Sequence, residues 1–297
     1  MKKVFLLSIA FLMAVSIFGQ TIKVTPTLKK GMNKTYTNTT AITMMDQTIN
    51  VVSEQHFSIT KETPQGYEML LESTNFSSDA KDDNLASRLL TIGTEIMKDS
   101  KIYLSLNKEG KLQDIINYEE VKTKCLATGE QMVDELIKAA PEISQVLTRE
   151  ALVDQVAATL TQENLIKSLT GNANPLALFG LTIVNGMQDK YNNNMVDLKR
   201  TWLVNGKKIF ASAKSDMSKE DLKAYVLSQI EKLAPQQADM IKENIDMVLS
   251  SDLIKIDVTE NANYELADDL WIKSMETTID SSMMGQKTSS HTKIQQK

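Results

Sequence analysis

Residues 35–60 read TYTNTTAITMMDQTINVVSEQHFSIT and carry the strongest indication of the fold. The stretch is rich in Thr, Val, Ile and Tyr, which favour strands, and it lacks the spacing of an apolar helical stripe. A turn at residues 45–47 divides it, so we expect 35–43 to pair with 48–60 as an antiparallel hairpin. The many threonines indicate that one face of this hairpin is in water.

The same pattern continues on both sides of this stretch. Toward the middle of the chain we expect a second hairpin that closes at residues 64–66, a short helix from Leu85 to Met97, and a hairpin of 101–106 with 111–116. At the other end, 270–279 and 287–294 flank a turn at 283–286. Its tip, SMMGQ at 282–286, echoes TMMDQ at 43–47, which suggests that the first and last hairpins belong to one sheet.

The middle of the chain has a helical character. A helical spacing begins after Tyr118 and is stopped by Pro141, and Thr148 and Thr161 are typical N-caps for two further helices. The apolar segment from Pro175 to Met187 is expected to be a short core helix. Beyond it we expect a hairpin of 202–212 that turns at residues 205–206, helices that begin at Ser218 and Pro235, and a strand at 254–258.

Together these elements predict an α+β protein in which N- and C-terminal hairpins form a curved antiparallel sheet and a helical insert covers one face. We expect one domain over residues 20–297. Its parts are a strand-rich segment at 20–117, the helical insert at 118–190, and a mixed segment with the C-terminal hairpin at 191–297.

The first nineteen residues have the pattern of a cleavable signal peptide. Lys2 and Lys3 precede an apolar run from Val4 to Phe18, which is shorter than the ~20 residues that span a bilayer. Gly19 suits the position before the cut. No cysteine follows it to accept a lipid, so we expect an unlipidated periplasmic or secreted protein with no integral membrane span after processing.

Composition excludes several classes of partner and chemistry. The net charge is −5 with acidic and basic residues interspersed, which argues against nucleic acid. Cys125 is the one cysteine, so no intramolecular disulfide is available, and its apolar helical neighbours predict burial. We expect no cofactor. The sequence leaves the oligomeric state open, and it does not separate a periplasmic from an extracellular location.

No catalytic or metal-binding pattern is complete. His56 and His291 lie in Thr-rich strands without a second ligand at metal spacing, and both Ser-x-x-Lys matches, at Ser58 and Ser290, also lie in strands. The acidic loop at residues 79–84 lacks the glycine and glutamate of a calcium loop, so a solvated turn that caps the next helix is expected. We therefore expect a protein that is not an enzyme.

Three short segments resemble a known family. They are LKKG at 28–31 with Tyr36, LNKEGKL at 106–112, and LWI at 270–272. In these segments the chain resembles a family of exported bacterial proteins that is known as a domain of unknown function, and at a distance it resembles curved-sheet carriers of the lipoprotein-localisation-factor type. The resemblance covers the strand-rich ends and implies binding of an apolar ligand, without site residues.

The leading hypothesis is a noncatalytic exported envelope protein that binds an apolar small molecule or lipid. A structural or protein-interaction module is the first alternative, and a hydrolase whose carboxylates meet only on folding is the second. For the leading hypothesis we expect the apolar central segment to pack under the sheet and to line any ligand cavity, with Leu176, Phe179, Leu181, Ile183 and Val184 as the lining residues.

The signal-peptide interpretation can be tested by mass. When the full chain is expressed in a bacterium with a general secretory pathway, the exported protein is expected to begin at Gln20 or Thr21, because signal peptidase cuts after a small residue such as Gly19. Intact mass spectrometry of the exported fraction measures the mature start. Exported protein that still carried residues 1–19 would contradict the interpretation.

Overall fold

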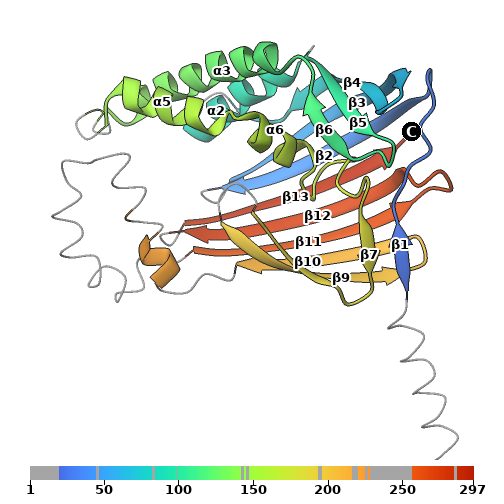
Figure 1. The fold of residues 1–297 in the computed structure, drawn as a ribbon. Coiled ribbons are helices and arrows are strands. Elements are labelled where there is room, and N and C mark those ends of the chain that lie inside the picture. The colour runs from blue at the N-terminus through green and yellow to red at the C-terminus, as the bar shows by residue number, and fades with distance from the viewer. Residues whose placement is uncertain are drawn as a thin grey trace, which may run out of the picture.

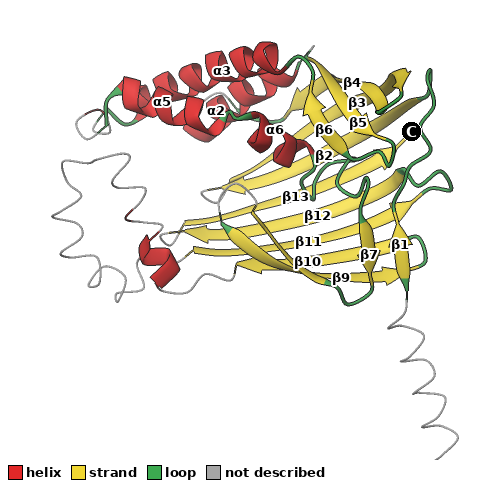
Figure 2. Cartoon of the chain, viewed as in Figure 1, coloured by secondary structure: helices red, strands yellow, loops and turns green. Residues whose placement is uncertain are grey.

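The computed structural model describes residues 20–44, 47–81, 84–98, 100–141, 144, 147–192, 196–215, 220–224, 227, 256–283 and 286–297. Within them the chain forms an open antiparallel sheet and a group of helices, so the protein belongs to the α+β class (Figures 1 and 2). The helices expected from Ser218 and Pro235 lie mostly outside the described residues.

The N-terminal half of the sheet follows the expected order. β2 and β3 form the long first hairpin, which turns at the predicted place, and the second and third hairpins add β4, β5 and β6. Thr43 lies opposite Thr48, as the pairing of 35–43 with 48–60 requires. The bounds are β2 Asn33–Met44, β3 Gln47–Thr63, β4 Gly66–Ser78, β5 Lys101–Asn107 and β6 Leu112–Ile115.

The C-terminal half is a second meander. It adds one strand that was not predicted, β8, because the charged sequence of residues 188–192 has no apolar run that would mark a buried strand. The predicted hairpin at residues 205–206 joins β9 to β10. The bounds are β8 Gln188–Asn192, β9 Asp197–Asn205, β10 Lys208–Ser215, β11 Ile256–Leu266, β12 Ile272–Met283 and β13 Gln286–Gln296.

The two meanders meet where β2 pairs with β13, which confirms that the first and last hairpins share one sheet. The order across the sheet is β6-β5-β4-β3-β2-β13-β12-β11-β10-β9-β8, and every neighbouring pair is antiparallel. A separate two-stranded sheet pairs β1 Thr21–Lys23 with β7 Thr182–Val184.

Four helices, α2, α3, α5 and α6, gather beside the N-terminal half of the sheet, and a short helical stretch at residues 220–224 lies beside the C-terminal half (Figure 1). α2 Leu85–Met97 is capped by the Asn84 side chain, and the predicted caps Thr148 and Thr161 begin α5 Arg149–Thr159 and α6 Gln162–Leu169. α3 Tyr118–Ala139 packs on α2 and α5, while α2 contacts β4 and α6 contacts β6. These four helices therefore cover one end of the face rather than its whole width.

The prediction of a core helix at Pro175–Met187 is wrong. This segment makes a series of turns and then the strand β7, whose Ile183 pairs with Ile22. Gly180 has a φ of +74° and lies so close to the neighbouring hairpin that a Cβ there would be 2.5 Å from the Cβ of Lys111. A helix cannot make this approach, so the tertiary contact overrides the local apolar pattern.

This turn-rich segment closes the centre of the core. Phe179 packs edge-on against the fully buried Trp271, with ring centroids 4.9 Å apart, and Trp271 also contacts Phe57 at 6.1 Å. The Trp271 indole N–H donates to the Thr27 carbonyl at 3.0 Å. The aromatic cluster thus ties together the sheet, the N-terminal segment and the turns that cover the sheet.

β4 and β5 approach closely at Gly66, because this residue has no side chain. At Gly66, where β4 begins beside β5, a Cβ would lie 2.0 Å from the carbonyl oxygen of Leu106. Gly66→Ala is therefore expected to lower the free energy of unfolding by about 3 kcal/mol, because the backbones must move apart. Urea unfolding monitored by circular dichroism measures the loss.

Gly206→Ala is the matched control for this substitution. Gly206 also has a positive φ, of +58°, but a Cβ added there would meet no atom within 4 Å. Gly206→Ala is expected to lower the free energy of unfolding by about 1 to 2 kcal/mol, from backbone strain alone. Equal losses in the two variants would show that the contact with Leu106 is unimportant.

Candidate functional site

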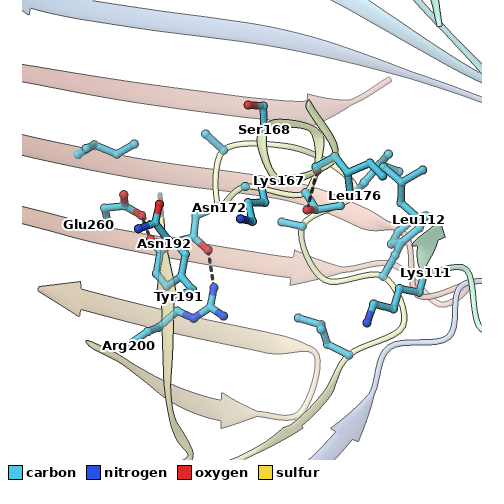
Figure 3. A pocket seen from close by; sticks show the side chains of 18 residues that line it. Lys111, Leu112, Lys167, Ser168, Asn172, Leu176, Tyr191, Asn192, Arg200 and Glu260 are labelled. Atoms are coloured by element: carbon cyan, nitrogen blue, oxygen red, sulfur yellow. Dashed lines mark hydrogen bonds between the residues drawn. The ribbon is translucent and has the colours of Figure 1, made fainter. Parts of the chain in front are cut away.

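A cavity of about 620 Å³ lies between the turn-rich segment 170–181 and the C-terminal half of the sheet. Figure 3 shows that the side chains that line the cavity come from the turn-rich segment and from the sheet. The apolar part of the lining comes mainly from the turns, from α6 and from the start of β6, and it includes Leu112, Ile166, Leu176, Ala177, Phe179 and Leu181. The volume lies within the range of about 300 to 1,000 Å³ that is usual for small-molecule sites.

The structure separates the five residues that were expected to line a cavity. Leu176, Phe179 and Leu181 do line it. Ile183 is fully buried in the core, and Val184 is 39% exposed on the outside of the small sheet. Side chains alternate between the two faces of a strand, so two consecutive residues of β7 cannot both face the cavity. The assignment of Ile183 and Val184 rested on the helix that does not form.

The floor of the cavity is a buried polar network. Glu260 is 4% exposed, and its carboxylate accepts hydrogen bonds from the Tyr191 hydroxyl and from the Asn172 side-chain amide, the latter at 2.8 Å. Arg200 donates to the Asn172 side-chain oxygen at 3.0 Å and pairs with Asp189 through two hydrogen bonds of 2.6 and 3.0 Å. Each charged side chain of this network therefore has a hydrogen-bond partner.

Strand register explains how these charges meet. Asp189, Arg200, Ala213 and Glu260 lie directly opposite one another on β8, β9, β10 and β11. Ala213 is small, and the long side chains on either side of it belong to one network. The Arg200 guanidinium is also stacked between two rings, 4.3 Å from the centroids of Tyr191 and of Trp202.

Asn172 connects the covering turns to the sheet. Besides its side-chain bonds, its backbone carbonyl accepts hydrogen bonds from the Tyr264 hydroxyl at 3.0 Å and from the Thr277 hydroxyl at 3.1 Å. Burial and the Glu260 carboxylate raise the pKa of Tyr191, and burial raises the pKa of Tyr264. Both phenols therefore stay protonated at neutral pH and keep donating.

The charged residues that line the cavity are mostly basic. The charged residues of the lining are Lys111, Lys167, Arg200 and Glu260, three basic and one acidic. Lys111 lies in the turn before β6 and Lys167 near the end of α6, where it also pairs with the exposed Glu163 at 2.7 Å. In Figure 3 Lys111 lies on the far side of the cavity from Glu260, whereas Lys167 lies nearer to Asn172.

The remaining sequence candidates lie apart from this cavity. His56 bonds to Thr35 and Thr74, both at 3.0 Å, whereas His291 bonds to Glu276 at 2.7 Å, so the two histidines do not meet. Asp79 accepts hydrogen bonds from the backbone and side chain of Asn50. Within the described residues, no group of three or more His, Cys, Asp or Glu side chains could hold a metal ion.

Cys125 is half-buried rather than fully buried. It faces a small apolar pocket of about 220 Å³ between α3, α6 and β5, which Leu165 and Leu169 also line. Burial raises the pKa of its thiol. The thiol is therefore protonated at neutral pH, which makes it a poor nucleophile.

Comparison with known proteins gives a limited result. No protein-family model matches the sequence, and no curated protein matches it. Among solved structures, the fold is similar to part of the structure described as lipid–protein interactions in lipovitellin, with a TM-score of 0.38 and 9% sequence identity. The match covers 91% of this chain and 25% of that one, so the chain spans about a quarter of that protein's length. Membership of the exported bacterial family remains a prediction.

The bonds of the Asn172 side chain predict a large loss of stability when this side chain is removed. Asn172→Ala is expected to lower the free energy of unfolding by about 2 to 4 kcal/mol, because it removes a buried hydrogen-bond partner from both Glu260 and Arg200. Asn263→Ala, on the exposed face of β11, is the control and is expected to change it by less than about 0.5 kcal/mol. Urea unfolding compares the two. Similar losses would show that the network does not hold the covering turns.

Proposed function

We propose that this protein is a noncatalytic exported protein of the bacterial cell envelope that binds an amphipathic molecule with one apolar chain and an anionic head group. The observation that carries the proposal is the cavity between the covering turns and the sheet. It has an apolar wall of Leu176, Phe179 and Leu181, and its lining also includes the basic side chains of Lys111 and Lys167.

The cavity suits a chain better than a compact polar substrate. Most of its wall is aliphatic or aromatic, and burial of apolar ligand surface there is favourable by about 25 cal/mol for each Å² removed from water. The charges of the lining favour an anion, since Lys111 and Lys167 line the cavity while Glu260 is covered by Asn172 and Tyr191. A carboxylate or phosphate in the cavity would pair with Lys111, because Lys167 is already paired with Glu163.

A noncatalytic role agrees with the state of the polar groups. Arg200, Asp189, Asn172 and Glu260 are bonded to one another, so their hydrogen-bonding capacity goes into holding the turns. The phenols of Tyr191 and Tyr264 have raised pKa values and do not supply a base at neutral pH.

Export is supported by the charged and apolar pattern of residues 1–19. Among the described residues, no helix is both long and apolar enough to cross a membrane.

Dodecanoate tests the proposed ligand class. It is expected to displace an apolar fluorescent dye from the protein, and Lys111→Glu is expected to weaken it at least tenfold, or ~1.4 kcal/mol, because a carboxylate then faces the head group. Dodecanol, which has no charge, is expected to bind equally well to both proteins. Dye displacement and calorimetry measure the affinities.

Two further variants complete the test. Lys108→Glu makes the same charge change at an exposed position of the same turn outside the cavity and is expected to leave binding unchanged. Ala177→Trp fills the cavity from the turns and is expected to abolish binding of both probes. Dodecanoate binding that survived Ala177→Trp would refute this cavity as the site.

A further inference from the structure

A second cavity lies on the same side of the sheet, beneath α2. It has a volume of about 290 Å³ and shares no lining residue with the first cavity. The sheet, including Phe76 of β4, provides one wall, the floor, and α2 provides the other through Leu90, Gly93 and Thr94. The lining residues are Asn38, Thr40, Ile42, Val51, Ser53, Gln55, Ser73, Phe76, Leu90, Gly93 and Thr94.

Three polar side chains in the floor are buried. Gln55 lies directly opposite Ser73 on the neighbouring strand, and Ser53 is two residues before Gln55, so all three point to the same face. Their exposed fractions are 9% for Gln55, 2% for Ser73 and 6% for Ser53. Polar groups at this depth are almost always hydrogen-bonded.

One of these side chains lacks such a partner. Within the described part of the chain, the side-chain oxygen of Gln55 is buried without any hydrogen bond, and Ser53 and Ser73 lie beside it in the floor. The other hydroxyls of the cavity are already bonded. Thr40 bonds to Asn38 and to Thr292, both at 3.1 Å, and Thr94 donates to the Thr91 carbonyl at 2.9 Å. The unused hydrogen-bonding capacity of the floor is thus concentrated at Gln55.

The lining restricts the chemistry of an occupant. Within the described part of the chain, no charged side chain lines the cavity, so a charged group there would be buried without a counter-charge. A hydroxyl both donates and accepts, and it can therefore satisfy the amide of Gln55 and the hydroxyls of Ser53 and Ser73. The apolar part of the lining includes Phe76 of β4 and Leu90 of α2.

We propose that this cavity is a second binding site, for an uncharged group with several hydroxyls, of the size of one sugar ring. The hydroxyl edge of such a ring would face Ser53, Gln55 and Ser73, and its C–H face would pack on Phe76 and Leu90. The volume, near the lower end of the usual range for ligand sites, fits one ring rather than a chain of rings.

Saturation-transfer NMR with methyl β-glucoside tests the site. The wild-type protein is expected to transfer saturation to the glucoside, and glucuronate, which adds a charge, is expected to bind at least tenfold more weakly. Gln55→Leu is expected to weaken binding of the glucoside at least tenfold. It is not expected to lower the melting temperature, because leucine removes a buried oxygen that has no hydrogen-bond donor. Gln188→Leu, at an exposed position of β8, is the control and is expected to bind as wild type does.

A further probe distinguishes two sources of the ring. Octyl β-glucoside below its micelle concentration would bind like the methyl compound if the natural ligand is a free sugar. Tighter binding that Gln55→Leu abolishes would indicate a sugar carried on a lipid. If Gln55→Leu does not fold, Ser73→Ala replaces it with the same expectation. Absence of saturation transfer to the wild type, or unchanged binding in these variants, would overturn the proposal and indicate that the floor is satisfied by ordered water alone.

Discussion

The pairing of β2 with β13 is the interaction on which the rest of the structure depends. Nine consecutive residue pairs, from Tyr36 opposite Gln296 to Met44 opposite Thr288, join the first long strand to the last. Without them the chain would have two smaller meanders, each with an unprotected edge of backbone donors and acceptors. With them, a single face runs from β6 to β8, and both cavities lie on it.

Such a broad face must be covered, and α2, α3, α5 and α6 cover only one end of it. Over the remainder the chain uses the turns at 170–187, whose core anchors are Leu176, Leu178 and Phe179. Turns contain fewer internal hydrogen bonds than a helix and leave backbone groups to be satisfied. The Asn172 carbonyl, bonded to Tyr264 and Thr277, is one such group, and the polar network is the consequence of covering a sheet with irregular chain.

The two cavities differ in how their polar groups are satisfied. In the first, Glu260, Arg200 and Asn172 satisfy one another, so the apolar wall and the Lys111 side chain remain to meet a ligand. In the second, the buried side-chain oxygen of Gln55 has no partner among the described residues. A self-satisfied network holds structure, whereas an unsatisfied buried group leaves its bonding capacity to an occupant. This contrast is the physical basis for assigning different ligand chemistry to each cavity.

Local pattern was sufficient for the elements whose determinants lie within a few residues. The turn between Thr43 and Thr48, the caps Thr148 and Thr161, and the hairpin before Lys208 all follow from turn chemistry, capping and alternation. The pairing of the first and last hairpins was also foreseen, from the similarity of their tips. An unused signal was the alternation Val258, Glu260, Ala262, Tyr264, which places a carboxylate among inward-facing residues.

Tertiary structure alone decided the site. Residues 175–187 have the apolar content of a core helix, but the approach of Gly180 to Lys111 and the pairing of Ile183 with Ile22 select turns and a strand. The meeting of Arg200, Glu260 and Asn172 depends on the register of four strands and on a loop far away in sequence. The sequence by itself determined the short-range elements, because their energies depend on neighbours along the chain. The cavities were decided only on folding, because they exist in the space between segments that sequence patterns do not relate to one another.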